Sequence, residues 1–268
     1  PTGCSADVGL RGIGCISFPG LYPAAGIIDS HPAIKAASPQ APVNDWFMGD
    51  DWHHNGAFFL AHAFNWMARN GRYRPEPTKN FPRVTFDYGT PDGYEFYSRI
   101  KTLSEIDTKY LKGDVHFWFD IMEHGTYDEF WQARNIRPHL KNIKPAVMTV
   151  GGWFDAENLF GAIETYKYIE TLNPKTANTL VMGPWRHGGW ARGTGASFGD
   201  IPFNSNTSEF YRREIELPFF QQHLKQNIDA KLPEAWVFET GTNQWRRFDQ
   251  WPPEAAQPKS LFFHSQQK

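Results

Sequence analysis

Three short apolar runs in this chain each end at a polar residue of a chemically reactive type. The first run, at about 10–16, ends at Ser17. The second, KPAVMTVGGWFD, ends at Asp155, and the third, NTLVMGPWRHGG, carries His187 directly after its apolar part. Apolar runs of this length, bounded by Gly and Pro, predict buried strands. The positions of these three polar residues constrain the fold more than any other feature of the sequence.

The segment between the second and third runs has the spacing of a helix. In ENLFGAIETYKYIETL the apolar side chains recur every three or four positions, at Leu159, Ile163, Tyr166 and Ile169. Strand, helix and strand in this order make a unit of a parallel sheet. Because the carboxyl ends of parallel strands meet at one edge of a sheet, we expect the three polar residues to converge there.

A serine, an acid and a histidine at one sheet edge can carry out nucleophilic catalysis together. A serine hydroxyl is a poor nucleophile until a base takes its proton, and an imidazole needs an acid on its other nitrogen to fix its tautomer. The order Ser, Asp, His along the chain is that of α/β-hydrolases. Any one of these residues alone would be interpreted as a turn or cap residue, so the prediction depends on all three occurring at strand ends.

Four segments carry a resemblance to a known family: CISFPG, HPAIKAASPQAPVNDWFMGDDWHHNGAF, GGWFDAENLFGA and NTLVMGPWRHGGW. In this order and spacing they resemble the α/β-hydrolases related to X-Pro dipeptidyl peptidases and cocaine esterase. The sequence is most similar to their α-amino acid ester hydrolase branch, near the glutaryl-cephalosporin acylases. The resemblance implies Ser17 as nucleophile, Asp155 as orienting acid, His187 as general base and the backbone N–H of Phe18 as an oxyanion donor.

The resemblance also implies a substrate-binding set. In the α-amino acid ester hydrolase branch a carboxylate cluster binds the substrate's α-ammonium, and its positions fall on Asp51, Glu157 and Asn158. Asn158 replaces a carboxylate, which predicts weaker recognition of the amine. Without the resemblance, Asp51 could equally cap the following helix, and Glu157 would favour a helix dipole. Two aromatic residues beside the triad are expected to be pocket walls, Trp153 and Trp185.

The sequence pattern changes three times, near residues 45, 143 and 231, which predicts four segments. Residues 1–44 are expected to form the hydrolase core with the nucleophile turn, 45–142 a helical cap, 143–230 the second part of the core, and 231–268 the start of a C-terminal jelly-roll domain. Within the core we expect a helix at about 19–29, a strand at 34–37 and a helix at about 208–224. The tail alternates in the manner of antiparallel strands.

Two departures from the family pattern affect the first strand. Cys15 stands where the nucleophile turn has glycine, and we expect it to cost some strain, although its side chain is small. Only about ten residues precede the strand, so we expect an incomplete parallel sheet that lacks the N-terminal strands and the tyrosine that completes the oxyanion hole. The chain then resembles the central piece of a longer protein, with an open apolar edge at Gly12–Ile16.

Composition excludes several classes of partner. The formal net charge of -2, with no Lys/Arg run, argues against nucleic acid. No apolar stretch approaches the ~20 residues of a membrane helix. An aromatic content of 16% favours a small organic or short peptide substrate.

His53 and His54 beside Asp50 lack the H-E-x-x-H spacing, so no metal and no cofactor are expected. GTGASFG at 193–199 does not match a phosphate loop and is predicted to be flexible.

We therefore expect a serine hydrolase that cleaves esters or amides of small, amino-bearing acyl groups through an acyl-enzyme on Ser17. An X-Pro dipeptidyl peptidase, a plain carboxylesterase and a glutaryl-type acylase remain alternatives within the enzyme class. A non-catalytic fragment of such an enzyme is the alternative from another class. By resemblance the full-length protein is expected to be a homo-oligomer, and a periplasmic or secreted location fits the family.

Overall fold

The central sheet of the protein has six strands in the order β1-β2-β5-β6-β9-β10. It is seen in a computed structural model that describes residues 10–73, 76, 85–225 and 232–263. The first five strands of this order are parallel, and β10 is antiparallel to β9. The predicted mostly parallel α/β sheet is confirmed. The strands are β1 (Arg11–Ile16), β2 (Ile34–Gln40), β5 (Ala146–Gly152), β6 (Asn178–Gly183), β9 (Ala235–Glu239) and β10 (Gln244–Phe248).

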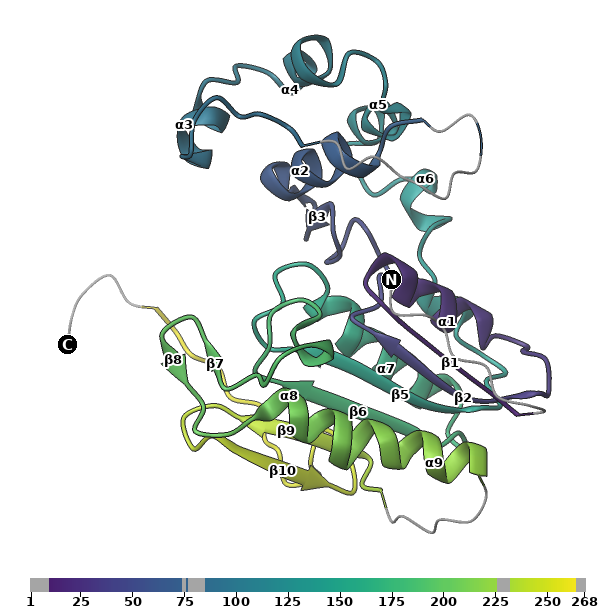
Figure 1. Cartoon of the computed structure of the whole chain (residues 1–268). Helices are drawn as coiled ribbons and strands as arrows, with labels where there is room; N and C mark the ends of the chain where they lie inside the picture. Colours follow the sequence, from purple (N-terminus) through teal and green to yellow (C-terminus); the bar gives the residue numbers. More distant parts are fainter. Residues whose placement is uncertain (1–9, 74–75, 77–84, 226–231, 264–268) are drawn as a thin grey trace.

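Helices cover both faces of this sheet (Figure 1). On β5 the buried side chains alternate between the faces: Val147 packs towards α1 and α7, whereas Met148 and Val150 pack towards α9. Burial on both sides explains why the strands read as continuous apolar runs. The covering helices are α1 (Leu21–Gly26), α7 (Leu159–Leu172), α8 (Thr207–Phe210), a π-helical turn (Tyr211–Glu216) and α9 (Leu217–Lys225).

The first βα connection is tighter than the sequence predicts. A 3₁₀ turn at Phe18–Gly20 precedes α1, which ends at Gly26, and Asp29 has a positive φ of 46°. The helix expected at 19–29 is therefore shorter at both ends. The second strand, expected at 34–37, extends to Gln40. Ser17 thus stands directly at the junction of the first strand and the helical turn.

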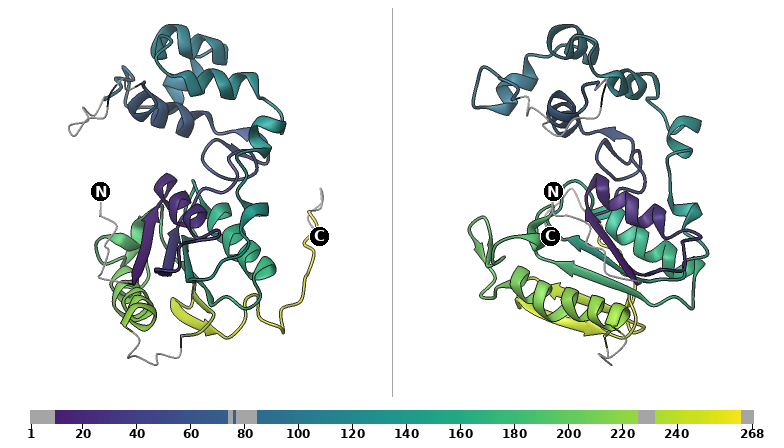
Figure 2. Two further views of the ribbon diagram at one scale, coloured as in Figure 1. Left: turned by 90° about the vertical axis from the view of Figure 1, so that its right-hand side faces the viewer. Right: turned by 45° about the vertical axis from the view of Figure 1, so that its right-hand side comes forward.

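A helical segment between β2 and β5 stands apart from the sheet, beyond α1 in Figures 1 and 2. One buried aromatic-rich cluster within it is formed entirely by residues between Phe47 and Trp131. The segment therefore has a core of its own. Its elements are β3 (His53–His54), β4 (Ala57–Phe58), α2 (Leu60–Asn70), α3 (Gly93–Ser98), α4 (Leu103–Ile106), a π-helical turn (Asp107–Leu111), α5 (His116–Glu123), α6 (Glu129–Gln132) and a 3₁₀ turn (Arg137–His139).

The tail differs from the sequence-based expectation. A separate β domain was expected from residue 231, but β9 pairs in parallel with β6 and so belongs to the central sheet. The reason is burial on both faces: Ala235 and Val237 pack against the α7 side, and Trp236 packs against the α8–α9 side. Only the antiparallel pairing of β9 with β10 follows the predicted pattern. Residues 264–268 of the tail lie outside the described residues.

β1 is one of the two edge strands of the central sheet among the described residues, and β10 is the other. Beside it lies a pocket of about 600 Å³ whose walls include Gly12, Ile16, Phe220 and Leu224. An exposed, largely apolar edge was expected at this strand. No helix in the described part of the chain is both long and apolar enough to cross a membrane.

Candidate active site

Ser17 occupies a strained position at the end of β1. Its backbone has φ 71° and ψ −142°, which L residues rarely adopt, and strain of this kind is concentrated at functional sites. Its backbone N–H donates to the carbonyl of Gln40 at 3.0 Å, and its own carbonyl accepts from Gly20 at 2.6 Å. A strained serine between a strand and a helix is the arrangement that presents a nucleophilic hydroxyl in α/β-hydrolases.

The turn is held tight by the absence of a side chain at Gly20. A Cβ there would lie 2.6 Å from the carbonyl oxygen of Gln40 and 3.2 Å from that of Cys15. Cys15 itself sits within β1 and is paired with Pro39 of β2. Because Gly20 has no side chain, the turn can pack closely against the backbone at the ends of β1 and β2.

His187 and Asp155 form a hydrogen-bonded pair. Nδ1 of His187 lies 2.9 Å from Oδ2 of Asp155, which is buried. The other carboxylate oxygen, Oδ1, accepts the backbone N–H groups of Glu157 at 2.8 Å and Asn158 at 3.1 Å. The carboxylate is therefore fixed by the start of α7. With Nδ1 donating to Asp155, Nε2 is left as the proton acceptor.

The charged groups around His187 favour its role as a general base. Burial lowers the pKa of its imidazole, but the hydrogen bond and charge of Asp155, with the charges of Glu157 and Asp51, raise it more, so the pKa ends above 6.5. Nε2 makes no hydrogen bond among the described residues, and the carboxylate of Glu157 lies 3.5 Å away. The atom that would take a proton from Ser17 is available.

Ser17 and His187 line one open pocket of about 1200 Å³. The structure thus brings the three sequence-predicted residues together, Asp155 through its bond to His187. No hydrogen bond joins Ser17 to His187 in this state, which is common for catalytic groups without substrate. The pocket is roomy enough for a substrate with a side chain of its own.

One wall of this pocket was missed by sequence reasoning. The glycine-rich stretch at 193–199 was expected to be a flexible loop, but it enters a hairpin of β7 (Ser197–Phe198) and β8 (Ile201–Pro202). Phe198 stacks on Phe154 with ring centroids 4.5 Å apart and planes 10° apart, and both line the pocket. The signal in the sequence was the aromatic residue among the glycines.

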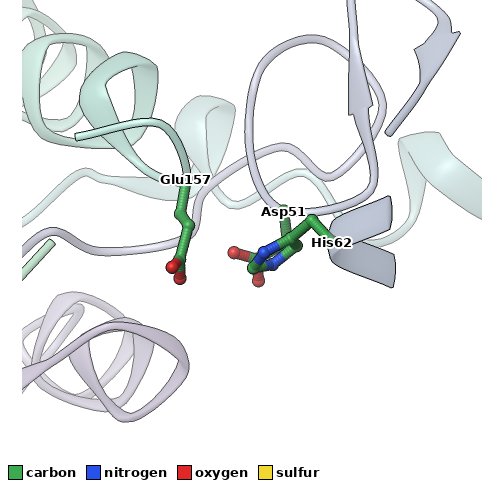
Figure 3. Close-up of side chains that lie close together, drawn as sticks. All are labelled: Asp51, His62 and Glu157. Carbon is green, nitrogen blue, oxygen red and sulfur yellow. The ribbon is translucent and has the colours of Figure 1, made fainter. Parts of the chain in front are cut away.

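Two carboxylates of the substrate-binding set that the resemblance implies lie near His187. Asp51 and Glu157 come close together with a third group, His62, and their ligand atoms are all within 4.8 Å of one another. Figure 3 shows Asp51 and His62 side by side, with Glu157 across from them. Burial raises the pKa of Asp51 to about 7, helped by the charge of Glu157 and opposed by the hydrogen bond from Asn158. Burial also raises the pKa of Glu157.

Asn158 supports the carboxylates. Its Nδ2 donates to Oδ1 of Asp51 at 3.1 Å and to Oδ1 of Asp50 at 3.3 Å, and the residue is fully buried. Asp50 also accepts the backbone N–H groups of Asn44, Asp45 and Gly161, so it ties the start of the helical segment to α7. Burial raises the pKa of Asp50 to about 8 against these donors.

His62 was not found from the sequence. It lies on α2, within the helical segment, and burial lowers the pKa of its imidazole to about 4, with the charge of His187 acting in the same direction. Its ring stacks on Phe59 at 5.3 Å and packs against Trp52 at 6.0 Å. No motif places this residue near the sheet edge, because its position depends on how the helical segment packs.

The predicted aromatic residues lie in different places. Phe18 directs its ring to the helical segment, stacked on Trp46 with centroids 6.0 Å apart. Trp185 lines the main pocket, but its indole is buried and donates to Oγ1 of Thr207 at 2.9 Å. Trp153 does not line that pocket.

The expectation for Trp153 is corrected by its contacts. Its Nε1 donates to the carbonyl of Phe238 at 3.0 Å, and it lines a separate small pocket beside β9 and Trp251. The side chain therefore anchors the last parallel strand. His53 likewise packs in the core of the helical segment, against Phe47 and Trp131.

Residues 2–189 match the X-Pro dipeptidyl-peptidase (S15) family. The chain belongs to this family. The match includes all three residues of the Ser17, Asp155 and His187 set and the whole helical segment.

Individual relatives agree with this assignment. The chain is 22% identical to the cocaine esterase of Rhodococcus sp. (strain MB1 Bresler) over 270 residues, covering 94% of this chain and 44% of the esterase. An aminopeptidase from the marine sediment archaeon Thaumarchaeota archaeon is similar with a TM-score of 0.82 and 30% identity, over 92% of this chain and 40% of that one. An α-amino acid ester hydrolase is similar with a TM-score of 0.78 and 27% identity, over 91% of this chain and 39% of that one. The chain spans less than half the length of each of these proteins.

Proposed function

We propose that this protein is a serine hydrolase that cleaves α-amino acid esters or related amides through an acyl-enzyme on Ser17. The observation that carries the proposal is the strained Ser17 at the end of β1, which shares a pocket with a His187 held in one tautomer by Asp155. These are the parts that acyl transfer needs: a presented hydroxyl, an acceptor nitrogen and an orienting acid.

The chemistry follows in two half-reactions. His187 Nε2 takes the proton of the Ser17 hydroxyl as the oxygen attacks the substrate carbonyl, and then returns it to the leaving alcohol or amine. Asp155 stabilises the imidazolium that forms. Water then attacks the acyl-enzyme by the same route, which releases the acid and restores the serine. The backbone N–H of Phe18 is the oxyanion donor that this chain supplies, since it follows the nucleophile directly.

The amino-bearing acyl group is supported by the carboxylates beside the base. Asp51 is 6% exposed and Glu157 lies 3.5 Å from the base nitrogen of His187. Among the described residues neither carboxylate forms an ion pair with a lysine or arginine. A substrate ammonium would relieve this unbalanced negative charge. Two of the similar structures are, by name, an aminopeptidase and an α-amino acid ester hydrolase.

An X-Pro dipeptidyl peptidase is the second candidate, favoured by the name of the matched family. Its substrates also carry a free amino terminus, but one residue further from the scissile bond. Comparing Xaa-Pro anilides with α-amino acid esters separates the two candidates. A preference for acetyl or glutaryl compounds over both would indicate a plain carboxylesterase or a glutaryl-type acylase.

The reaction is tested by Ser17→Ala. Removing a catalytic serine lowers turnover by roughly 10⁶-fold in well-studied serine hydrolases. We expect release of p-nitrophenol from an amino-acyl ester to fall to the background rate, and mass spectrometry of the unsubstituted protein to detect an acyl adduct on Ser17 with a slow substrate. Turnover that survives in the variant would refute the nucleophile. The experiment is best run on this chain and on a version extended at both ends.

The amine preference is tested by Asp51→Asn. This change removes one negative charge but keeps an oxygen that can accept from Asn158. The Michaelis constant for amino-acyl esters should rise by about tenfold or more, as for a lost charge-assisted hydrogen bond, and that for acetyl esters should change little. Equal changes for both substrates would favour the plain carboxylesterase.

A further inference from the structure

The two carboxylates of the proposed amine site face an imidazole of the helical segment, which also carries Asp51, whereas Glu157 comes from the sheet edge. Asp51 precedes β3 and Glu157 leads into α7, whereas His62 lies in the first turns of α2. One ligand atom from each of the three lies within 4.8 Å of the other two (Figure 3). The helical segment thus supplies one side of a site whose other side is at the sheet edge.

The spacing suits an ammonium nitrogen. A primary ammonium has three N–H donors in a tetrahedral fan, and acceptors at ~2.8 Å along those directions lie roughly 4.6 Å apart. The three ligand atoms observed here, all within 4.8 Å of one another, can surround one nitrogen in this way. With one oxygen from each carboxylate taking one N–H, the His62 nitrogen is placed to accept the third.

The imidazole has the right protonation state for this role. Because burial and the nearby His187 keep the pKa of His62 at about 4, its ring is neutral at pH 7 and one nitrogen can accept a hydrogen bond. The contacts with Phe59 and Trp52 limit how far the ring can turn. A neutral acceptor also spares the site the repulsion that a charged ring would bring to a cation.

We propose that His62 is the third acceptor for the substrate's primary α-ammonium and a specificity-determining residue of this hydrolase. The inference rests on the proposed function, because it names a further residue of the same substrate site. In this arrangement the bound amine links the helical segment to the sheet edge. Selectivity for a primary amine then depends on α2 as well as on the two carboxylates.

The test compares two substrates of nearly the same shape. Glycyl and propionyl p-nitrophenyl esters differ in having an ammonium or a methyl group at the same position, so their ratio of kcat/KM isolates amine recognition. In His62→Leu this ratio should fall by about tenfold to a hundredfold, chiefly through a higher KM for the glycyl ester, with a much smaller change for the propionyl ester. His62→Gln, which keeps an acceptor, should recover much of the loss. The matched control is His54→Leu, an exposed imidazole of the same segment, which should keep the original ratio.

A binding measurement keeps this test separate from the catalytic proposal. In the Ser17→Ala background, calorimetry should detect glycinamide but not propionamide, and His62→Leu should weaken the glycinamide signal by the same factor as the kinetic ratio. This readout needs no turnover, so it decides the role of His62 even if the nucleophile assignment fails. An equal fall for glycyl and propionyl esters would overturn the proposal. Tight Zn²⁺ binding that is lost in His62→Leu, with glycinamide binding unaffected, would also overturn it and assign the cluster to a metal.

Discussion

The carboxylate of Glu157 lies 3.5 Å from Nε2 of His187, the nitrogen that has to accept the proton of Ser17. Among the described residues, Glu157 is the acidic group paired with this nitrogen, whereas Asp155 pairs with Nδ1. The charge helps to raise the pKa of His187 above its usual value, after Asp155. A carboxylate in this place links substrate recognition to catalysis, because a bound ammonium would neutralise the same charge that acts on the base.

Glu157→Gln should shift the pH dependence of the reaction. The base works only when His187 is neutral, so activity rises as pH increases through its pKa. Removing the nearby negative charge lowers that pKa, and the acid limb of kcat/KM for a propionyl ester should move to lower pH. Glu164→Gln is the control, since Glu164 lies on the same helix but pairs with Arg137 and Lys167. An acid limb that stays in place in Glu157→Gln would contradict the coupling.

Asp155→Asn should abolish catalysis while keeping the start of α7. The Asn carbonyl can still accept the backbone N–H groups of Glu157 and Asn158, as Oδ1 does now. Its amide would donate to Nδ1 of His187 and move the ring proton to Nε2, which can then no longer accept from Ser17. The corresponding change in other serine hydrolases lowers kcat by about 10⁴-fold.

The comparison with Asp155→Ala separates the two roles of this carboxylate. Alanine also loses the two hydrogen bonds from the backbone N–H groups of Glu157 and Asn158, so the free energy of unfolding should fall by about 1 kcal/mol relative to Asp155→Asn, measured by urea unfolding. Both variants should lose activity alike. An active Asp155→Asn would show that the acid does not fix the tautomer.

Sequence reasoning predicted that Ser17, Asp155 and His187 lie at one edge of the sheet because their positions are local to strand ends. Ser17, Asp155 and His187 each follow an apolar run. Because the strands are parallel, their carboxyl ends lie at the same edge of the sheet. The same reasoning failed for Trp153. Whether a residue next to a strand end points into the pocket or towards the next strand depends on where β9 lies, and the sequence assigned β9 to another domain.

His62 could not be predicted for a related reason. Nothing in LAHAFNW marks this histidine, and its apolar neighbours favour an interpretation as an ordinary core residue. Its role depends on the packing of the helical segment against the sheet edge, in particular on the buried Asp50 that holds residues 44 and 45 against α7. Contacts between residues so distant in the chain have no periodic signature.

Gly20→Ala tests the tight turn after the nucleophile. A Cβ at Gly20 would lie 2.6 Å from the carbonyl oxygen of Gln40, and the nearby atoms are all backbone, so none can simply rotate away. We expect a loss of about 1–3 kcal/mol in the free energy of unfolding, as for overpacked cores, and a loss of activity through displacement of Ser17. Gly26→Ala is the control: its Cβ would meet only a side-chain atom of Ile13 at 3.8 Å. As a helical position, it should gain up to about 1 kcal/mol. A Gly20→Ala protein as stable as the control variant would argue against close packing at this turn.

Asp51 should make the protein less stable as pH rises from acid to neutral. Its pKa in the folded protein is about 7, above the value of 3.8 for a free carboxyl, chiefly because of burial. The folded state therefore binds a proton that the unfolded state has lost, and the stabilisation is fully present below pH 4 and disappears as pH rises through 7. A rise from 3.8 to about 7 corresponds to at most about 4 kcal/mol. Asp50, with a pKa of about 8, acts in the same direction.

Asp51→Asn isolates this contribution, because the amide does not titrate and its oxygen can still accept from Asn158. Urea unfolding between pH 4 and pH 8 should show a smaller fall in stability for the variant than for the original protein. Asp249→Asn, at an exposed carboxylate near β10, should leave the pH profile as it is. If the profile of Asp51→Asn were as steep as that of the original protein, the carboxylate would already be ionised across this range. It would then present a full negative charge to the substrate at every pH in the experiment, and the pH dependence of amine binding would have to arise from the substrate and from Glu157.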